Sequence, residues 1–249
     1  GRLGEMGQAV KGILQAYLGK INQSGGIYGR KLELVVAEYG EDRAATRREL
    51  HKLVTEGDVF ALLSPFAVAI EDEFGRLAND AKIPVVGPLS LFGDDPHAIN
   101  QYVFHLLSGV GELAEVLALH VGSEPKLKLR SAVLLHPDNS DGSGVADALE
   151  EQLKSQGWTQ LSRIGFQPGA LDAAAVAKTL QARGAEAVFL LGPGADIGAL
   201  AREAARDAYV PLLLLPGPLA PRTALDLPEA FEGRVLLAYP TIPSDQKPD

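Results

Sequence analysis

The stretch NQSGGIYGRKLELVVAEYGED, residues 22–42, joins a helical pattern to an apolar run through a corner rich in glycine. The apolar residues of 6–21 recur at the three- and four-residue spacing of an amphipathic helix. Gly25 and Gly26 predict the end of that helix, because glycine adopts the left-handed backbone conformation that closes helices. Residues 31–37, KLELVVA, then predict a β-strand.

The same alternation of strand and helix continues along the chain. Further strands are expected at residues 59–63, 83–87, 102–106, 131–136, 159–166, 185–192, 212–216 and 234–240. Helical patterns fall at residues 44–57, 68–81, 111–122, 143–157, 173–184 and 195–208. Strands that alternate with helices of about 12 residues are typical of a parallel, doubly wound α/β sheet.

Composition limits the classes of function. The 249 residues carry a formal net charge of −9, which argues against binding to nucleic acid or to anionic membrane surfaces. No apolar run reaches the length of a transmembrane helix, so we expect no membrane insertion. There is no cysteine, which excludes disulfides and thiolate chemistry. The chain begins GRLGEMG without an initiating methionine, as expected of a trimmed segment.

The order of these motifs resembles the type I periplasmic solute-binding proteins of the branched-chain amino acid (leucine/isoleucine/valine) transport group. The resemblance begins at INQSGGIYGRK and continues through VFALLSPFA, IPVVGPLS, SAVLLHPDNSDGSGVADAL and AEAVFLLGPGADIGALAREA. It implies two Rossmann-like, doubly wound parallel-sheet lobes joined by a hinge. The expected N-terminal lobe is 1–107, the C-terminal lobe is 108–238, and 239–249 start the return across the hinge.

The resemblance also implies what is absent. The family pattern has a strand before Gly7 and continues well beyond Tyr239, so the sequence lacks the first strand and the C-terminal part of that pattern. Without the first strand, we expect unpaired backbone in the first sheet. In the corner, we expect Ile27 to return to the core.

Candidate ligand contacts follow from the geometry of open α/β sheets, where ligands bind beyond the carboxyl ends of strands. In a two-lobed protein these ends face one cleft between the lobes. The resemblance adds two positions, because the family's hydroxyl cluster falls at Ala67-Val68-Ala69 and a later hydroxyl position falls at Leu91. The candidate ligand-binding residues are Ser64, Pro65, Phe66, Ala67, Pro88, Leu89, Ser90, Leu91, Asn139, Asp141, Pro193, Gly194 and Gly217.

Most of the residues with which the family binds the amino and carboxylate groups of an amino acid are missing at these positions. Ala67 and Leu91 lack hydroxyl groups, a family aromatic falls at Asp141, and the acid that holds an α-amino group falls near Gly217. We therefore expect a more apolar or aromatic solute that bears a carboxylate, rather than leucine, isoleucine or valine.

Other chemistries find little support. GPGADIG, residues 192–198, invites a dinucleotide interpretation, but the next strand ends without an acid, which favours a packed turn. The five histidines lack metal-ligand spacing. His136 is expected to be a polar residue at the end of a strand, and the alternative is that it contacts the ligand. Ser140 and Ser143 are expected to cap a helix, and Trp158 to pack at the surface of the second lobe.

The resemblance, together with the lack of a catalytic constellation, therefore implies a non-catalytic, periplasmic solute-binding component of an ABC-type importer, without a cofactor or metal. Its expected partners are a small-molecule ligand and the permease subunits of the transporter. The alternative is a ligand-sensing or protein-interaction domain excised from a larger periplasmic protein. An enzyme is the third hypothesis, and no catalytic constellation supports it.

Overall fold

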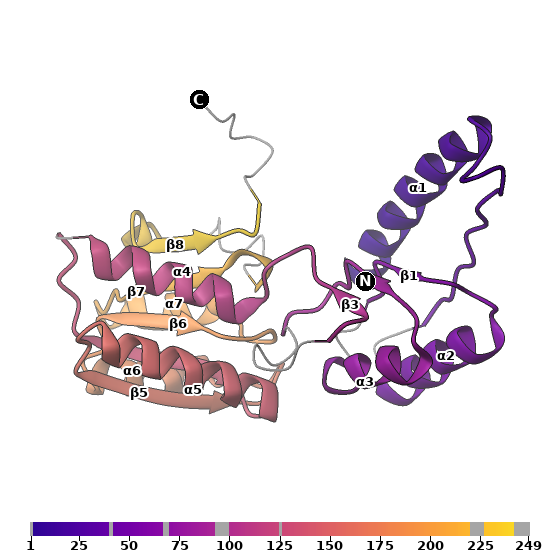
Figure 1. Cartoon of the computed structure of the whole chain (residues 1–249). Helices are drawn as coiled ribbons and strands as arrows, with labels where there is room; N and C mark the ends of the chain where they lie inside the picture. Colours follow the sequence, from indigo (N-terminus) through magenta and orange to yellow (C-terminus); the bar gives the residue numbers. More distant parts are fainter. Residues whose placement is uncertain are drawn as a thin grey trace. The chain divides into compact units, whose positions relative to one another are not determined.

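A computed structural model of the chain describes residues 2–39, 42–66, 70–92, 100–124, 126–219 and 227–241. The chain forms two compact units, one of residues 1–90 with 94–106 and the other of residues 91–93 with 107–249. Both units carry parallel β-sheet and helices, which confirms the predicted α/β class (Figure 1).

The first unit has a short parallel sheet with one covered face. Its sheet has the order β1-β2-β3, and all the pairs are parallel. The buried apolar side chains of α2 and α3, including Leu50 and Phe74, pack against Leu62, Val85 and Val103 of the three strands. The elements are α1 (Arg2–Gln23), α2 (Arg43–Glu56), β1 (Leu62–Leu63), α3 (Glu71–Ala81), β2 (Val85–Val86) and β3 (Val103–Phe104).

The glycine-rich corner ends α1 as predicted. Gly25 and Gly26 have φ angles of 99° and 76°, and the Gly26 N–H donates to the Ile21 carbonyl at 2.9 Å. The expectation that Ile27 returns to the core is wrong, because this side chain is 48% exposed. The corner is held instead by Asn22, whose side chain exchanges two hydrogen bonds with the backbone of Leu32.

The strand predicted at residues 31–37 is absent. These residues are extended, but they form no β-ladder with any other described segment. The apolar pattern gives the segment its extended character, whereas a strand also requires a partner for its backbone groups. The unpaired backbone expected in the first sheet is therefore present along this segment.

The second unit contains a larger parallel sheet of order β5-β4-β6-β7-β8. The order reverses at β4, as in doubly wound folds. Its elements are α4 (Val110–Ser123), β4 (Ser131–Pro137), α5 (Ser140–Ser155), β5 (Gln160–Phe166), α6 (Ala173–Ala182), β6 (Ala187–Leu190), α7 (Ile197–Arg206), β7 (Leu212–Pro216), the 3-10 turns η1 (Gly217–Leu219) and η3 (Glu229–Phe231), and β8 (Val235–Ala238).

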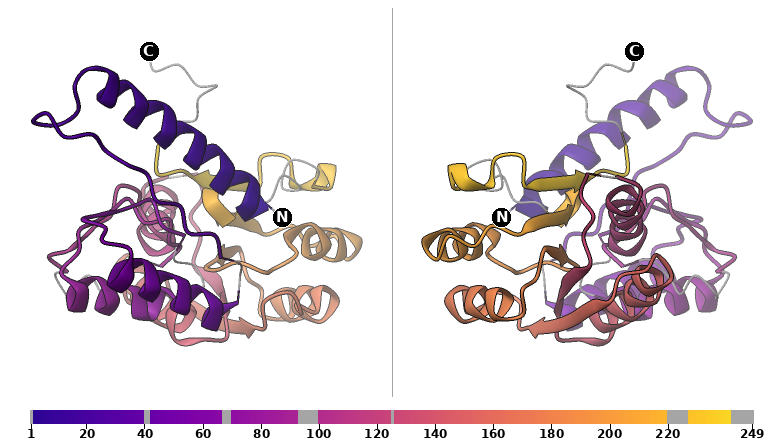
Figure 2. Two further views of the ribbon diagram at one scale, coloured as in Figure 1. Left: turned by 90° about the vertical axis from the view of Figure 1, so that its right-hand side faces the viewer. Right: turned by 90° about the vertical axis from the view of Figure 1, so that its left-hand side faces the viewer.

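Helices cover both faces of this second sheet, as Figure 2 shows. Successive strand residues point to opposite faces, so Ala132 and Leu134 of β4 pack with α4 and α5. Val133 and Leu135 pack with α6 and α7 on the other face. The central strands are therefore continuous apolar runs, as parallel strands buried on both faces require.

Trp158 lies inside this unit rather than at its surface. It is only 5% exposed, and its ring meets that of Phe189 in an edge-on contact with centroids 6.3 Å apart. The surface position expected from sequence is wrong, because the chain turns inward directly after α5 and its Gly157. Edge-on aromatic pairs of this kind add to the stability of a core.

Candidate ligand site at the strand ends

The first unit brings two predicted loops together. Phe66 and Leu89 form an isolated parallel bridge just beyond β1 and β2, and the Leu89 N–H donates to the Pro65 carbonyl at 2.9 Å. Ser64 has a left-handed φ of 47°, which turns the chain at the end of β1. Ser64–Phe66 and Pro88–Ser90 therefore lie at one edge of the sheet.

Tyr39 holds this edge in place. Its hydroxyl accepts a hydrogen bond from the Phe66 N–H and donates one to the Phe66 carbonyl, both at 3.1 Å. Burial is the main cause that raises the pKa of Tyr39 above its ordinary value, and the hydrogen bond to Phe66 opposes the shift. The strand predicted at residues 31–37 stops just before Tyr39, and nothing in the local sequence indicates its contact with Phe66, 27 positions away.

Two serine hydroxyls remain available at this edge. Ser64 and Ser90 are both half-buried, and neither side chain makes a hydrogen bond to another described residue. The half-buried apolar residues Phe66 and Leu89 belong to the same two loops, where their backbones pair. Pro88 is buried beneath the loop. This edge therefore combines hydroxyl donors with an apolar surface.

Leu91 and Ala67 differ from the other candidates. Leu91 belongs to the second unit, where its carbonyl accepts a hydrogen bond from the Val110 N–H at 2.7 Å and its side chain packs on the α4 core. Ala67 lies outside the described residues, as do its two neighbours in the predicted loop.

In the second unit, Asn139 and Asp141 lie where β4 gives way to α5. Asn139 is the N-cap of α5, and its side chain accepts from the Gly142 N–H at 2.8 Å. The expectation that Ser140 and Ser143 cap this helix is wrong, because both lie within it and the extended backbone of Asn139 provides the cap. The N–H groups of Ser140 and Asp141 have no acceptor among the described residues.

The ends of β6 and β7 are closely packed. Gly194 takes a φ of 88°, and its carbonyl accepts a hydrogen bond from the Gly169 N–H at 2.8 Å. Gly217 leaves room for the ring of Tyr239, which would lie 2.4 Å from an added Cβ. Pro193 is half-buried in the loop after β6. Since β4, β6 and β7 are neighbours in the sheet, these loops share one edge with the start of α5.

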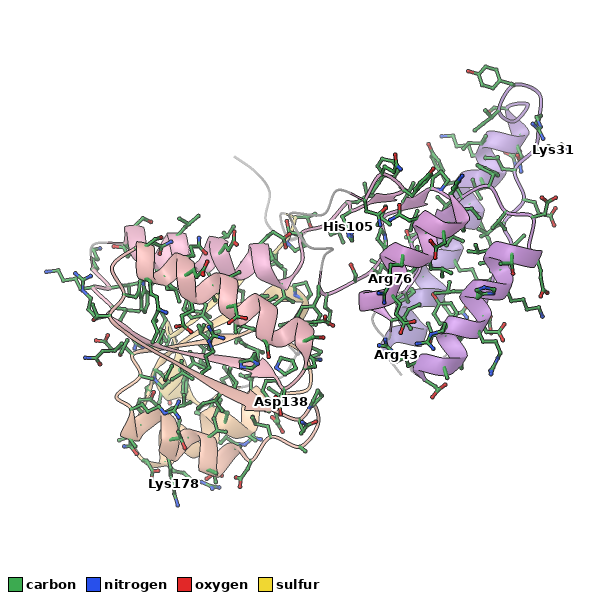
Figure 3. The ribbon with its side chains drawn as sticks, turned by 60° about the horizontal axis from the view of Figure 1, so that its bottom comes forward. Lys31, Arg43, Arg76, His105, Asp138 and Lys178 are labelled. Carbon is green, nitrogen blue, oxygen red and sulfur yellow. The ribbon has the colours of Figure 1, made fainter. Side chains whose placement is uncertain are left out.

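Acidic side chains stand along this second edge. Asp138 is exposed, lies at the end of β4 (Figure 3), and accepts a hydrogen bond from the Gln167 amide at 3.4 Å. Asp172 and Asp196 cap α6 and α7 and are engaged with backbone N–H groups. The second cap fits the packed turn predicted for GPGADIG. Asp141 is half-buried, and its carboxylate accepts a long hydrogen bond from the Ser140 hydroxyl at 3.5 Å.

His136 is a buried strand residue. Its ring nitrogen Nδ1 lies 2.8 Å from the carbonyl oxygen of Pro137, a partner within its own strand. Within the described part of the chain, no group of three His, Cys, Asp or Glu side chains could hold a metal ion. No helix described here combines the length and apolar character needed to cross a membrane.

Both edges carry groups that can bind a small molecule. The first edge offers hydroxyl donors and apolar side chains, and the second offers free N–H groups at a helix start together with carboxylates. These groups can hold a small polar solute, because N–H groups at a helix start bind anions and carboxylates accept from ammonium groups.

Comparison with known proteins identifies the family of this chain. Residues 1–246 match the family model described as periplasmic binding protein. The chain belongs to the periplasmic binding protein family. This membership confirms the resemblance that the order of the motifs indicated, and the fold it implies.

Curated relatives support the same assignment. The chain is 26% identical over 220 residues to Leu/Ile/Val-binding protein homolog 3 of Brucella melitensis, covering 87% of this chain and 58% of that protein. It is 24% identical to a Pseudomonas aeruginosa protein named amino acid binding protein, covering 74% of this chain and 48% of the relative. The chain therefore spans about half the length of these relatives.

Solved structures share the fold. The leucine binding protein LivK of Thermotoga maritima is 17% identical with a TM-score of 0.66, covering 85% of this chain and 58% of that one. The Streptococcus pneumoniae substrate binding protein LivJ, solved with isoleucine, is 19% identical with a TM-score of 0.64 and coverages of 82% and 57%. All the relatives named here are described as binding proteins and none as an enzyme, in agreement with the non-catalytic function predicted for this family member.

Proposed function

We propose that this periplasmic binding protein family member is the non-catalytic solute-binding component of an ABC-type importer in the periplasm. Its proposed ligand is a small apolar or aromatic solute that bears a carboxylate, and its proposed partners are the permease subunits of the transporter. Family membership and the binding-protein descriptions of its relatives support the general function.

The pairing of free hydroxyls with apolar side chains at one strand edge carries the proposal for the ligand. Ser64 and Ser90 follow two neighbouring strands, and their hydroxyl groups are free to donate to a carboxylate. Phe66 and Leu89 belong to the same two loops and can contact an apolar or aromatic group. A site with two neutral donors and an apolar wall suits a monocarboxylate with a hydrophobic body.

The second unit supports the same class of solute through the start of α5. The unpartnered N–H groups of Ser140 and Asp141 can bind a carboxylate, with help from the helix dipole. Asp141 disfavours a second negative charge on the solute at this place. At this edge of the second unit, the negative charge of Asp141 favours a solute with one carboxylate over a dicarboxylate or a phosphate ester.

Thermal shift over a panel of solutes tests the proposal. The panel contains leucine, isoleucine and valine, aromatic monocarboxylates, short fatty acids and one dicarboxylate of matched size. A ligand that binds only the native state raises the melting temperature by mass action. We expect a rise with an apolar or aromatic monocarboxylate and a smaller rise, or none, with leucine and with the dicarboxylate.

A pair of serine variants locates the binding. Ser90→Ala removes a free hydroxyl and should weaken the best ligand of the panel by about tenfold, since a lost hydrogen bond to a charged group costs about 1.5 kcal/mol or more. Ser155→Ala is the matched control, because its hydroxyl donates to the Gln152 carbonyl at the far end of α5. Equal affinities in both variants would remove Ser90 from the site. Silence across the panel would contradict solute binding and favour a protein-interaction domain.

A further inference from the structure

An aromatic side chain from the segment after β2 reaches the strand ends of the second unit. Phe92 belongs to that unit, although the strands beside it come much later in the chain. Its ring atom Cζ lies 3.6 Å from the place of an added Cβ at Gly192, which follows β6. The same place is 2.1 Å from Cγ of Pro137, the last residue of β4. The ring of Phe92 therefore lies where the carboxyl ends of the paired strands β4 and β6 meet.

The segment that carries this ring is fixed to the second unit. The carbonyl of Leu91 accepts a hydrogen bond from the N–H of Val110, the first residue of α4, at 2.7 Å. The side chains of Leu91 and Phe92 both pack against the core that α4 and α5 form with the sheet. Because Phe92 is half-buried, one part of its ring is anchored and another part stays accessible at the strand ends. A ring held in this way is preorganised for contact with a ligand.

Pro137 connects the surroundings of this ring to the start of α5. Its carbonyl accepts a hydrogen bond from the Asn139 N–H at 2.9 Å. Its Cδ atom lies 2.9 Å from the place of an added Cβ at Gly142, in the first turn of α5. Contacts from Gly192 to Pro137 and from Pro137 to Gly142 therefore lead from the ring of Phe92 to the first turn of the helix.

An aromatic ring close to these N–H groups determines which solute fits best. The N–H groups of Ser140 and Asp141, without acceptors among the described residues, are the donors proposed above for a carboxylate. An alkyl body and an aryl body of equal size gain about equally from leaving water. The aryl body gains more beside Phe92, because two aromatic rings attract each other in offset or edge-on contact.

Two other aromatic residues lie at the same strand ends but are placed differently. Phe166 ends β5 and is only 5% exposed, so the core covers it. Tyr239 follows β8, and its ring atom Cδ1 lies 2.4 Å from the place of an added Cβ at Gly217, after β7. In the sheet, β6 separates β7 from β4, so Tyr239 stands farther from the start of α5 than Phe92 does.

We propose that Phe92 is a specificity-determining residue at the strand ends of the second unit, where it selects an aryl solute over an alkyl solute of equal size and charge. The inference rests on the function proposed above and narrows its ligand class to aryl monocarboxylates. The first turn of α5 holds the carboxylate, and the aryl group contacts the ring of Phe92 beside Gly192.

Two matched probes test this preference. Phenylpropanoate and cyclohexylpropanoate carry the same charge and a terminal ring of similar size, but only the first ring is aromatic. Isothermal titration calorimetry measures the dissociation constants of both with the chain as it stands and with Phe92→Leu. We expect the chain to bind phenylpropanoate about three- to tenfold more tightly, as one aromatic pair allows. In Phe92→Leu this ratio should fall to about one, because leucine keeps an apolar contact and lacks the ring.

The ratio of the two affinities separates recognition from a structural role. If Phe92 only supports the fold, Phe92→Leu weakens both probes alike and leaves the ratio unchanged, which would overturn the proposal. Equal affinity of the unchanged chain for both probes would overturn it without any variant.

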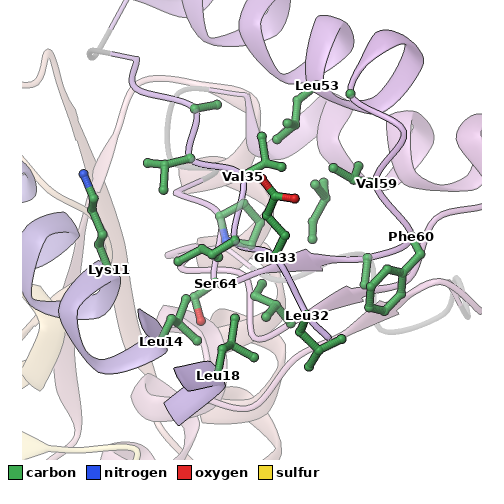
Figure 4. A pocket seen from close by; sticks show the side chains of 18 of the residues that line it. Lys11, Leu14, Leu18, Leu32, Glu33, Val35, Leu53, Val59, Phe60 and Ser64 are labelled. Atoms are coloured by element: carbon green, nitrogen blue, oxygen red, sulfur yellow. The ribbon is translucent and has the colours of Figure 1, made fainter. Parts of the chain in front are cut away.

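Two further rings serve as matched controls. Tyr239→Leu removes a ring from the same strand ends. Phe60→Leu removes a ring that is 75% exposed and lines a pocket of the first unit (Figure 4). Both variants should keep the ratio of the unchanged chain. Loss of the preference in either one, with the preference kept in Phe92→Leu, would assign the aryl contact to that other ring.

Failure of this inference and failure of the proposed function give different results. If another solute of the thermal-shift panel binds and neither probe does, the aryl preference is wrong and the solute-binding function stands. If no solute of the panel binds, the proposed function fails, and the role of Phe92 fails with it.

Discussion

The hydroxyl of Tyr39 bonds to both backbone groups of Phe66, accepting from the N–H and donating to the carbonyl, each at 3.1 Å. The two residues are 27 positions apart, so one side chain ties the extended segment to the loop after β1. Phe66 in turn bridges to Leu89, which makes Tyr39 a support for both predicted loops of the first unit.

Replacing this hydroxyl should loosen that edge. In Tyr39→Phe, the two backbone groups of Phe66 lose their partner while the ring remains, and we expect the free energy of unfolding to fall by about 1–3 kcal/mol. Urea unfolding measures the change. Tyr28→Phe is the control, because Tyr28 is 99% exposed and its loss should change the stability little. Equal effects of the two variants would show that the hydrogen bonds to Phe66 contribute nothing.

Two tyrosine hydroxyls should deprotonate only at a higher pH than free tyrosine does. Burial raises the pKa of Tyr39 and of Tyr209, whose hydroxyl donates to the Ala185 carbonyl at 2.6 Å. A raised pKa in the folded state means that the stabilisation is fully present below the unfolded pKa of about 10 and is lost as pH rises through the folded pKa.

Titration of tyrosinate absorbance checks this directly. We expect a late-titrating component in the folded protein that shrinks in Tyr39→Phe and again in Tyr209→Phe, and that is missing in urea. The free energy of unfolding should decline above about pH 10 and decline less steeply in each variant. A single titration at the pKa of free tyrosine would contradict the burial of both hydroxyls.

The strands and helices of the second unit could be predicted from sequence. Runs such as LLLLP at residues 212–216 are apolar without alternation because the sheet is covered on both faces, and this pattern is visible locally. The position of Trp158 could not be predicted in the same way. Its burial depends on the ring of Phe189, which comes near because β4 pairs with β5 on one side and with β6 on the other.

In the first unit, the sequence pattern does not predict which segments pair as strands. Residues 31–37 have the composition of a strand, but pairing depends on a neighbour that the pattern of the segment itself cannot reveal. The candidate site has the same limit. Strand ends are predictable from the order of elements, whereas the hydrogen bonds of Tyr39 to Phe66 and the cap made by Asn139 depend on the turns that follow each strand.

The cap of α5 gives a prediction that separates Asn139 from its serine neighbours. Asn139→Ala removes the acceptor for the Gly142 N–H and should lower the free energy of unfolding by about 1 kcal/mol. Ser140→Ala and Ser143→Ala lie inside the helix and should change it by much less. Chemical denaturation of the three variants decides the matter, and a larger loss in either serine variant would assign the cap to that serine.

Two glycine-to-alanine changes in the second unit should have opposite effects on stability. A Cβ at Gly192 would lie 2.1 Å from Cγ of Pro137, so Gly192→Ala forces the ends of β4 and β6 apart, and overpacking of this kind costs about 1–3 kcal/mol. Gly144 lies in α5, and no atom beyond its chain neighbours and the backbone of its own helix lies within 4 Å of an added Cβ. Gly144→Ala should therefore stabilise the protein by up to about 1 kcal/mol, because alanine favours helix over glycine.

Solute binding adds a second measurement to this pair. The start of α5 and the Pro193 loop flank the contact between Gly192 and Pro137, so a solute held at this edge should bind more weakly to Gly192→Ala. Gly144→Ala should bind the solute with unchanged affinity, because Gly144 is exposed and the added methyl group would contact no neighbouring element. If Gly192→Ala lowered the melting temperature but kept full affinity, the solute would be held without help from the ends of β4 and β6.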